Sequence, residues 1–271
     1  MHLNKLKVAF ISSILLGLGL TVQAQDSTKQ DMAELAKKVA NPISNLINIP
    51  IRNNSDFGVG ALDGSRNTVN IQPVVPFSLG TNLTLLTRTI IPIITQSNIT
   101  GVGQTQTGLA DISITGFFSP VKTKNGVIWG FGPALTIPVA TNDFFATKKL
   151  TIGPSAIILR QINGFTYGSL LTQSWSVAGS NTRQSISQMF VQPFFSYNWK
   201  SGASCGGNLE WTQNWKNNQT IVAFTPTVGG VTRLGKLPVA LSVGPRFNIA
   251  APSEIKSDFG VRASLAFLFP K

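Results

Sequence analysis

The sequence predicts an all-β protein: a closed antiparallel transmembrane β-barrel of about twelve strands, preceded by a short helix. Charged residues make up only 12% of the 271 residues and hydrophobic residues 42%, whereas about a quarter of the residues in a soluble domain are charged. After residue 24, however, no segment has the ~18 consecutive apolar residues that a membrane helix needs. A closed barrel is the other structure that satisfies its backbone polar groups in lipid, so we expect apolar residues at alternate strand positions.

Residues 1–24 have the order of a secretory signal peptide. Lys5 and Lys7 give a positive start, Val8 to Leu20 is an apolar core, and Ala24 ends a small-residue cleavage site. Position 25 is glutamine and not cysteine, so this is not a lipoprotein signal; a retained membrane anchor is the alternative. We therefore expect three parts: a signal peptide (1–24), a periplasmic segment with a short helix (25–43) and an outer-membrane barrel (44–271).

Residues 28–41 have the pattern of the one helix. Thr28 and Asp31 have the spacing of a capping box, which would start the helix at Thr28. Met32, Leu35, Ala36 and Val39 then recur on one face, and Asn41-Pro42 ends the pattern. The helix either closes the mouth of the barrel as a plug or packs at its rim as a tether.

From residue 43 onward the apolar pattern has a period of two. It is clearest at the end, where Phe259, Phe267 and Phe269 share one face of a strand and Arg262 and Ser264 share the other. An aromatic, apolar face toward lipid and a small or polar face toward a lumen explain this alternation. The expected strands are 45–58, 67–78, 83–96, 108–119, 127–139, 149–160, 164–176, 186–198, 205–215, 219–231, 237–249 and 258–269.

The connections between these strands alternate in length. Short Gly-, Asn- and Lys-rich turns alternate with mostly longer loops, as in a barrel with both termini in the periplasm. The link at 216–218 is short for an outer loop and is the weakest point of the strand count. Several prolines fall inside expected strands, and since proline cannot donate to the ladder we expect bulges or breaks there. Gly-Pro recurs at 132–133, 153–154 and 244–245, which indicates a repeated strand feature.

The proline-bearing strands also carry a family resemblance. Its segments include Gln72 to Phe77, Trp129 to Pro133, Gln192 to Phe194 and the ending Phe267 to Lys271. They resemble bacterial outer-membrane proteins of the family named for the meta-pathway of phenol degradation, often labelled neuromedin U-like. The resemblance covers nearly the whole chain after the signal peptide. It implies an outer-membrane transporter, and by analogy a preference for apolar or aromatic solutes.

The residue types present exclude several kinds of chemistry. The only histidine, His2, lies in the expected signal peptide, so hydrolases that activate a nucleophile with histidine are excluded. The single cysteine, Cys205, can form no intramolecular disulfide and has no histidine partner. We therefore expect no catalytic residues, no cofactor and no zinc or copper site. The net charge of +12 comes from scattered residues, which indicates contact with anionic lipid and no nucleic-acid partner.

Strand parity then selects the candidate site residues, because charged side chains face a lumen far more cheaply than hydrocarbon. The candidates for selectivity or gating inside the lumen are Arg52, Asp56, Arg88, Asp111, Glu210, Arg246 and Arg262. Both faces of the strand that holds Arg88 are apolar, which leaves the direction of that side chain open. The first strand and the last two become neighbours when the barrel closes, so Arg52, Arg246 and Arg262 should form a basic cluster beside Asp56.

Three functions remain after this reading. The first is passage of small molecules across the outer membrane of a Gram-negative bacterium, porin-like or as a transporter, with the cluster acting on ions. The second is a structural or surface-interaction barrel whose lumen is sealed by a salt-bridge network. The third is an enzyme that uses carboxylates alone. The expected partners are outer-membrane lipids, the machinery that inserts barrels through their final strand, and a small solute that the sequence does not identify.

Overall fold

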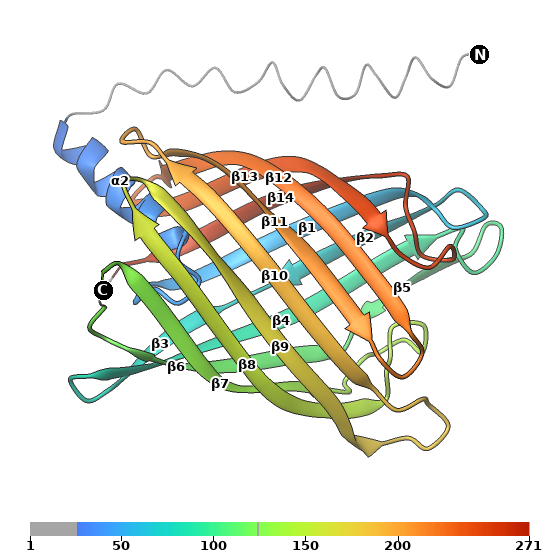
Figure 1. Ribbon diagram of the computed structural model, residues 1–271. Helices are drawn as coiled ribbons and strands as arrows, with labels where there is room; N and C mark the ends of the chain where they lie inside the picture. Colours follow the sequence, from blue (N-terminus) through green and yellow to red (C-terminus); the bar gives the residue numbers. More distant parts are fainter. Residues whose placement is uncertain (1–25, 124, 271) are drawn as a thin grey trace, which may run out of the picture.

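The computed structural model describes residues 26–123 and 125–270; the expected signal peptide lies outside them. The described chain forms one helix and a single sheet of fourteen strand segments that closes into a barrel (Figure 1). The elements are α2 (Asp26–Val39), β1 (Ile47–Val59), β2 (Gly64–Ile71), β3 (Val74–Leu79), β4 (Leu83–Ser97), β5 (Thr105–Leu109), β6 (Ile112–Pro120), β7 (Val127–Ile137), β8 (Lys149–Ile162), β9 (Phe165–Gly179), β10 (Ser187–Asn198), β11 (Ala203–Asn214), β12 (Gln219–Leu234), β13 (Leu237–Ala250) and β14 (Phe259–Phe269).

The barrel closes between its first and last strands. β1 and β14 pair antiparallel from Ile47 opposite Phe269 to Phe57 opposite Phe259. Every other strand pairs with its neighbours in chain order, and the segments β2 with β3 and β5 with β6 each occupy one position in the wall. The wall therefore has twelve antiparallel strands, and the predicted fold class is confirmed.

The two interrupted strands have different causes. β2 and β3 pair with β4 in one continuous register, and only Gln72-Pro73 separates them. The Gln72 N–H still donates to the carbonyl of Pro50 on β1, so the wall stays closed at this break. Between β5 and β6 the register against β4 changes by one residue, and the Ala110 N–H donates to the carbonyl of Pro92. This second interruption is a bulge.

Most of the other in-strand prolines remove ladder pairing without changing the register. On either side of Pro193, for example, Val191 lies opposite Trp211 and Phe194 lies opposite Asn208, with the pairs between them missing. The Gly-Pro repeats allow the backbones to approach closely. A Cβ added at Gly153 or Gly244 would lie 1.8 Å from a carbonyl oxygen of the neighbouring strand, so no larger residue fits before these prolines.

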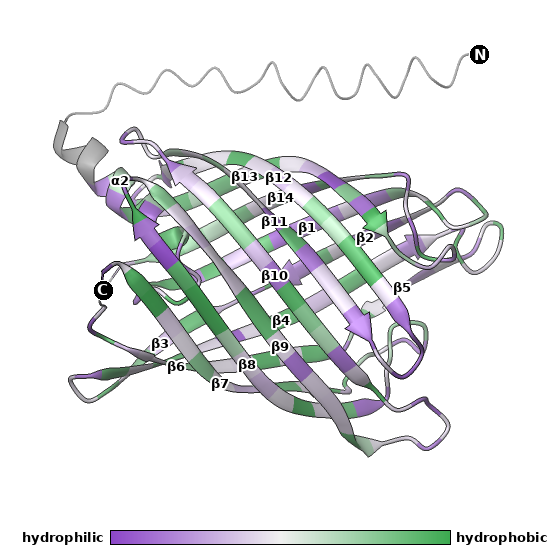
Figure 2. Cartoon of the chain, viewed as in Figure 1, coloured by the Kyte–Doolittle hydropathy of each residue, from purple (hydrophilic) through white to green (hydrophobic). Residues whose placement is uncertain are grey.

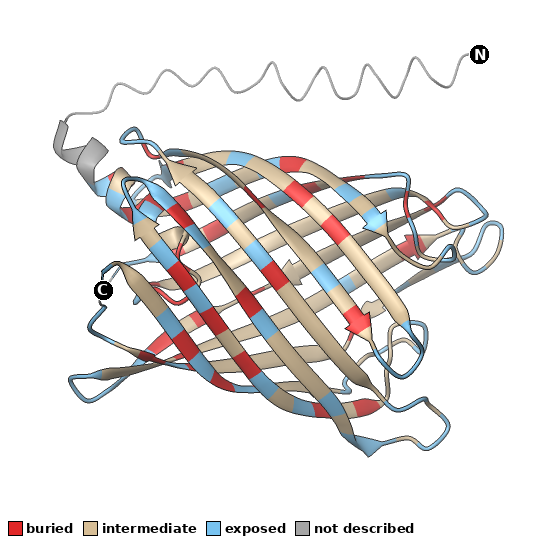
Figure 3. Ribbon diagram, in the orientation of Figure 1, coloured by how far each residue is buried: buried red, intermediate tan, exposed pale blue. Residues whose placement is uncertain are grey.

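Side chains alternate between the two faces of the wall, as expected. In β14, Arg262 and Leu268 point inward and are 4% and 0% exposed, whereas Phe259 and Phe269 point outward and are 39% and 40% exposed. Figures 2 and 3 show the same alternation of hydropathy and of burial along the other strands. Large apolar residues such as Trp129, Ile158 and Phe195 remain exposed on the outer face.

One flank of the outer face is polar instead. Near the loop-bearing end, Ser55, Asn67, Thr95 and Thr107 lie opposite one another on β1, β2, β4 and β5. Asn67 donates to Ser55, and the hydroxyls of Thr95 and Thr107 are 3.2 Å apart. The outer surface of the barrel is therefore not uniformly apolar.

The connections follow the expected alternation. Turns of two to six residues lie at the end that holds both termini, and one of the two-residue turns, Asn163-Gly164, has positive φ at both residues. Longer loops such as 98–104, 138–148, 180–186 and 251–258 lie at the opposite end (Figure 1). The short link after β11 is a turn at this same opposite end, so the expected strand count holds there.

The N-terminal segment packs at the mouth of the barrel and also enters it. Met32, Leu35 and Ala36 of α2 pack with Leu268 on the inner face of the wall. After the helix, Ile43 packs in a second cluster with inward residues of β4, β6, β8 and β9, among them Leu86 and Phe117. The helix begins at Asp26, so Thr28 lies inside it and the expected capping box is wrong. The sequence offered two alternatives, a tether at the rim and a plug in the mouth. The helix α2 packs at the rim as a tether, and the residues after it enter the barrel as a plug.

Among the described residues no helix is long and apolar enough to cross a membrane.

Candidate binding site in the barrel lumen

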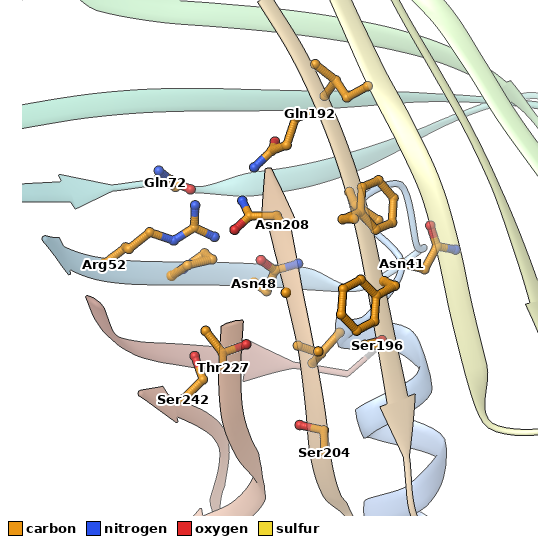
Figure 4. A pocket seen from close by; sticks show the side chains of 18 of the residues that line it. Asn41, Asn48, Arg52, Gln72, Gln192, Ser196, Ser204, Asn208, Thr227 and Ser242 are labelled. Atoms are coloured by element: carbon orange, nitrogen blue, oxygen red, sulfur yellow. The ribbon is translucent and has the colours of Figure 1, made fainter. Parts of the chain in front are cut away.

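A cavity of about 270 Å³ lies inside the barrel. It is lined by inward polar side chains from β1, β4, β10 and β11, by several apolar side chains and by Asn41-Pro42 of the N-terminal segment. Figure 4 shows the Arg52 side chain extending toward Gln72 and Asn208. The cavity is therefore amphipathic, because arginines and amides share it with apolar side chains such as Phe194 and Leu170.

Two of the candidate residues form an ion pair across the barrel interior. Arg262 of β14 donates from Nη1 and Nη2 to the two carboxylate oxygens of Glu210 on β11, each at 2.9 Å. Its Nε donates to Asn54 at 2.6 Å. The Arg262 side chain is 5% exposed and that of Glu210 21% exposed. This bidentate geometry is the strong form of an arginine–carboxylate pair.

Two further candidates form a second pair nearer the long loops. Nη1 of Arg246 on β13 lies 2.7 Å from a carboxylate oxygen of Asp56 on β1, and both side chains are 13% exposed. Asn248 donates to the same carboxylate at 3.4 Å and also to the hydroxyl of Ser257. The expected basic cluster is therefore corrected: Arg262 lies near Arg52, Arg246 lies nearer the long loops beside Asp56, and both Arg246 and Arg262 are paired with an acid.

Arg52 and Arg88 differ from these pairs. Both side chains point into the lumen, which settles the direction that the sequence left open for Arg88, and both line the cavity. Neither side chain has a hydrogen bond or an ion pair with the described residues. The charges that act on Arg52 are Arg262 and Arg88, which repel it, and Glu210, which attracts it. Glu210 is already held by Arg262, so positive charge is in excess at this point.

Asp111 does not belong to this group. It lies in the bulge between β5 and β6, and its carboxylate accepts hydrogen bonds from the Ala140 N–H and from the N–H and hydroxyl of Thr147. These bonds attach the loop 138–148 to the barrel wall. Sequence parity predicted a lumen residue, and the bulge instead uses Asp111 to anchor this outer loop.

The same loop carries an exposed ion pair. Lys148 Nζ lies 2.9 Å from the carboxylate of Asp143, and the hydrogen bond and positive charge of Lys148 hold the pKa of the Asp143 carboxyl below its usual value. Arg183 of the next long loop donates to the carbonyl of Asp143 at 3.0 Å. The two loops are thereby linked at the loop-bearing end of the barrel.

Sequence reasoning missed two inward cations. Arg66 on β2 donates to Gln96 at 2.9 and 3.2 Å, and Lys149 at the start of β8 is 7% exposed. Arg66 was missed because the expected strand began at residue 67, whereas β2 begins at Gly64. Lys149 could have been found from parity, because Thr151 and Ser155 share its face.

Among the described residues, the two acids that face the lumen, Asp56 and Glu210, are each paired with an arginine. Within residues 26–123 and 125–270 no group of three or more His, Cys, Asp or Glu side chains could hold a metal ion. What the arrangement can do chemically is bind: two unpaired guanidinium groups and several amides face a partly apolar cavity.

Comparisons with known proteins agree on the fold. No protein-family model matches the sequence, and no curated protein matches it. Among solved structures, the COG4313 outer membrane channel from Pseudomonas putida F1 superposes with a TM-score of 0.65 at 12% identity, over 83% of this chain and 96% of that one. The NanC porin superposes with a TM-score of 0.51 at 9% identity, over 81% of this chain and 98% of that one. At such identities the likeness shows the fold alone.

Proposed function

We propose that this protein is an outer-membrane channel through which small organic molecules pass, and that it is not an enzyme. The observation that carries the proposal is a closed barrel with a largely apolar outer face and an amphipathic cavity inside it. A closed barrel leaves no unpaired strand edge, which is what a lipid environment requires. A twelve-stranded barrel lies between filled eight-stranded barrels and open sixteen-stranded porins, so a narrow passage is the expected form.

The similar solved structures support the same proposal. Their descriptions name an outer membrane channel and a porin. The sequence resemblance to the phenol meta-pathway family points to apolar or aromatic solutes, although no family model supports that family name. Membrane lipids and the barrel-insertion machinery are the partners proposed with this location.

The state of the carboxylates supports the proposal that the protein is not an enzyme. Asp56 and Glu210 are each paired with an arginine, and the Asp111 carboxylate accepts hydrogen bonds from the loop 138–148. A general acid or base needs a carboxyl group within reach of a substrate proton. These three acids are instead engaged in contacts that hold the barrel together.

The test is conductance across a planar lipid bilayer. The purified barrel should be checked first for folding: the unboiled form should migrate faster than the boiled form on a detergent gel. Stepwise currents that scale with the number of inserted barrels would support the channel. Folded protein that inserts but carries no current would contradict it.

A sealed barrel is the second candidate, and Ile43 favours it. Ile43 is 5% exposed and packs among inward residues of four strands, so the lumen is filled at that level. The same experiment separates the candidates, provided that a variant without residues 26–46 is measured beside the full mature chain. Current from the shortened variant alone would assign the N-terminal segment a sealing role.

A further inference from the structure

We propose that the lumen holds a binding site for a small monocarboxylate with an apolar body, whose carboxylate is bound by Arg52 and Arg88. The inference deepens the proposed channel function by naming a solute class. Its binding test does not require conductance, so the two proposals can fail separately.

The first step of the argument is the excess charge. Arg262 has Glu210 and Arg246 has Asp56, but Arg52 and Arg88 have no ion pair or hydrogen bond with the described residues. Charged groups inside a protein are normally paired, because removing an unpaired ion from water is costly. Two unpaired guanidinium groups in one cavity therefore form a site that an anion would complete.

The second step is the placement of the two arginines. Arg52 lies on β1 and Arg88 on β4, on either side of the interrupted strand that holds Gln72. The break at Gln72-Pro73 lies between them, and Gln72 is 5% exposed and lines the same cavity. An oxyanion between the two guanidinium groups could also accept from the Gln72 amide. Guanidinium forks match a carboxylate in two-bond geometry, which an ammonium group does not.

The third step concerns the apolar residues in the lining of the cavity. Val74, Ile157, Leu170 and Phe194 line it together with the arginines, and Val74, Ile157 and Leu170 are less than 9% exposed. A free inorganic anion would make no apolar contact with these side chains. A carboxylate joined to a short hydrocarbon body places its charge on the arginines and its carbon atoms on the apolar side chains.

The experiment is calorimetric titration of hexanoate into the folded barrel in a neutral detergent. We expect saturable binding of one hexanoate per barrel and no binding of hexanamide, which has the same body without the charge. Acetate and inorganic phosphate should bind at least about tenfold more weakly, because each lacks the body that covers the apolar side. The variants Arg52→Gln and Arg88→Gln should each weaken hexanoate binding about tenfold, the scale of one lost charged hydrogen bond.

Arg160→Gln is the matched control, because Arg160 is an exposed residue near the turn after β8 and faces away from the lumen. It should bind hexanoate as the wild type does. Each variant is first checked for the faster-migrating folded form, and if one arginine variant does not fold the other still decides. Equal binding of hexanamide would show partition into detergent, and unchanged binding by a folded arginine variant would place the ligand elsewhere; both overturn the site. Phosphate binding as tight as that of hexanoate would overturn the apolar part.

Conductance separates this proposal from the channel itself. Hexanoate that binds to a barrel without current leaves the site standing and removes the channel. A conducting barrel that does not bind hexanoate leaves the channel standing and removes the site.

Discussion

Arg262 and Glu210 meet across the inside of the barrel, although β12 and β13 separate their strands in the wall. The ion pair thus links two strands of the sheet that are not neighbours in the wall. Glu210→Gln would leave the guanidinium of Arg262, 5% exposed, without its acid. We expect a loss of about 3 kcal/mol in unfolding free energy, the scale of breaking a buried pair from one side.

The measurement is urea unfolding followed by the detergent-gel shift. A second substitution, Arg262→Gln, in the Glu210→Gln background should restore much of the loss, because no unpaired charge remains at this position. Additive losses in the double variant would show that the two side chains do not act as a pair.

The two faces of β13 should tolerate charge differently. Leu241 is 45% exposed on the outer face, and Ser242 lines the cavity. If the barrel spans a bilayer, Leu241→Arg should cost about 2–4 kcal/mol near the membrane midplane, and Ser242→Arg much less. Folding into lipid vesicles at increasing urea measures both. Similar losses at the two positions would argue against a lipid-facing outer surface, or against this register.

The N-terminal segment should control access to the lumen. Deletion of residues 26–46 removes α2 and Ile43 from the inner face, and we expect a larger single-channel current than that of the full mature chain. Lys38→Gln, on the exposed side of α2, serves as the control and should leave the current unchanged. Identical currents from the deletion variant and the full chain would mean that the segment does not obstruct the path.

Asp111 should matter for the outer loop and not for the lumen. Asp111→Ala removes the acceptor of three hydrogen bonds from Ala140 and Thr147. We expect several-fold faster cleavage of the loop 138–148 by proteinase K, because an unanchored loop opens more readily. Asp63→Asn, in a different outer loop, is the control. Unchanged cleavage rates would remove the anchoring role.

Export should remove residues 1–24. The positive start, the apolar core and the small-residue site predict a mature chain that begins at Gln25. Intact mass of the membrane-extracted protein measures this directly. A mass that includes Met1 through Ala24 would favour the retained anchor.

Local sequence patterns predicted the strands of the barrel wall, because a strand's alternation does not depend on its neighbours. Side chains of a strand alternate with a fixed period, so the alternation of Phe259 to Phe269 gives strand, face and length without any knowledge of neighbours. The same parity placed Arg52, Glu210, Arg246 and Arg262 on the inner face. It failed at Asp111, because a bulge changes parity and no residue type marks its position unambiguously.

The pairing of the charges lay beyond the sequence. Adjacent strands suggested that Arg246 and Arg262 would gather with Arg52, but long side chains reach across a curved lumen as well as along its wall. The partner of Arg262 is therefore on β11, and the unpaired arginines are Arg52 and Arg88. The sequence also showed no sign that Ile43 enters the barrel, because the seven residues between α2 and β1 are too few to show a periodic pattern.

The pairing of β1 with β14 has a consequence for the order of assembly. Its eleven residue pairs join the first strand of the wall to the last, so these contacts have the largest sequence separation in the chain. Until β14 has formed, β1 and β13 both present unpaired edges, and such edges template aggregation. Contacts of this range are also the slowest to form, because the whole intervening chain must be arranged first. Loss of the final strand would thus produce an open sheet with two unpaired, aggregation-prone edges, and not a shorter barrel.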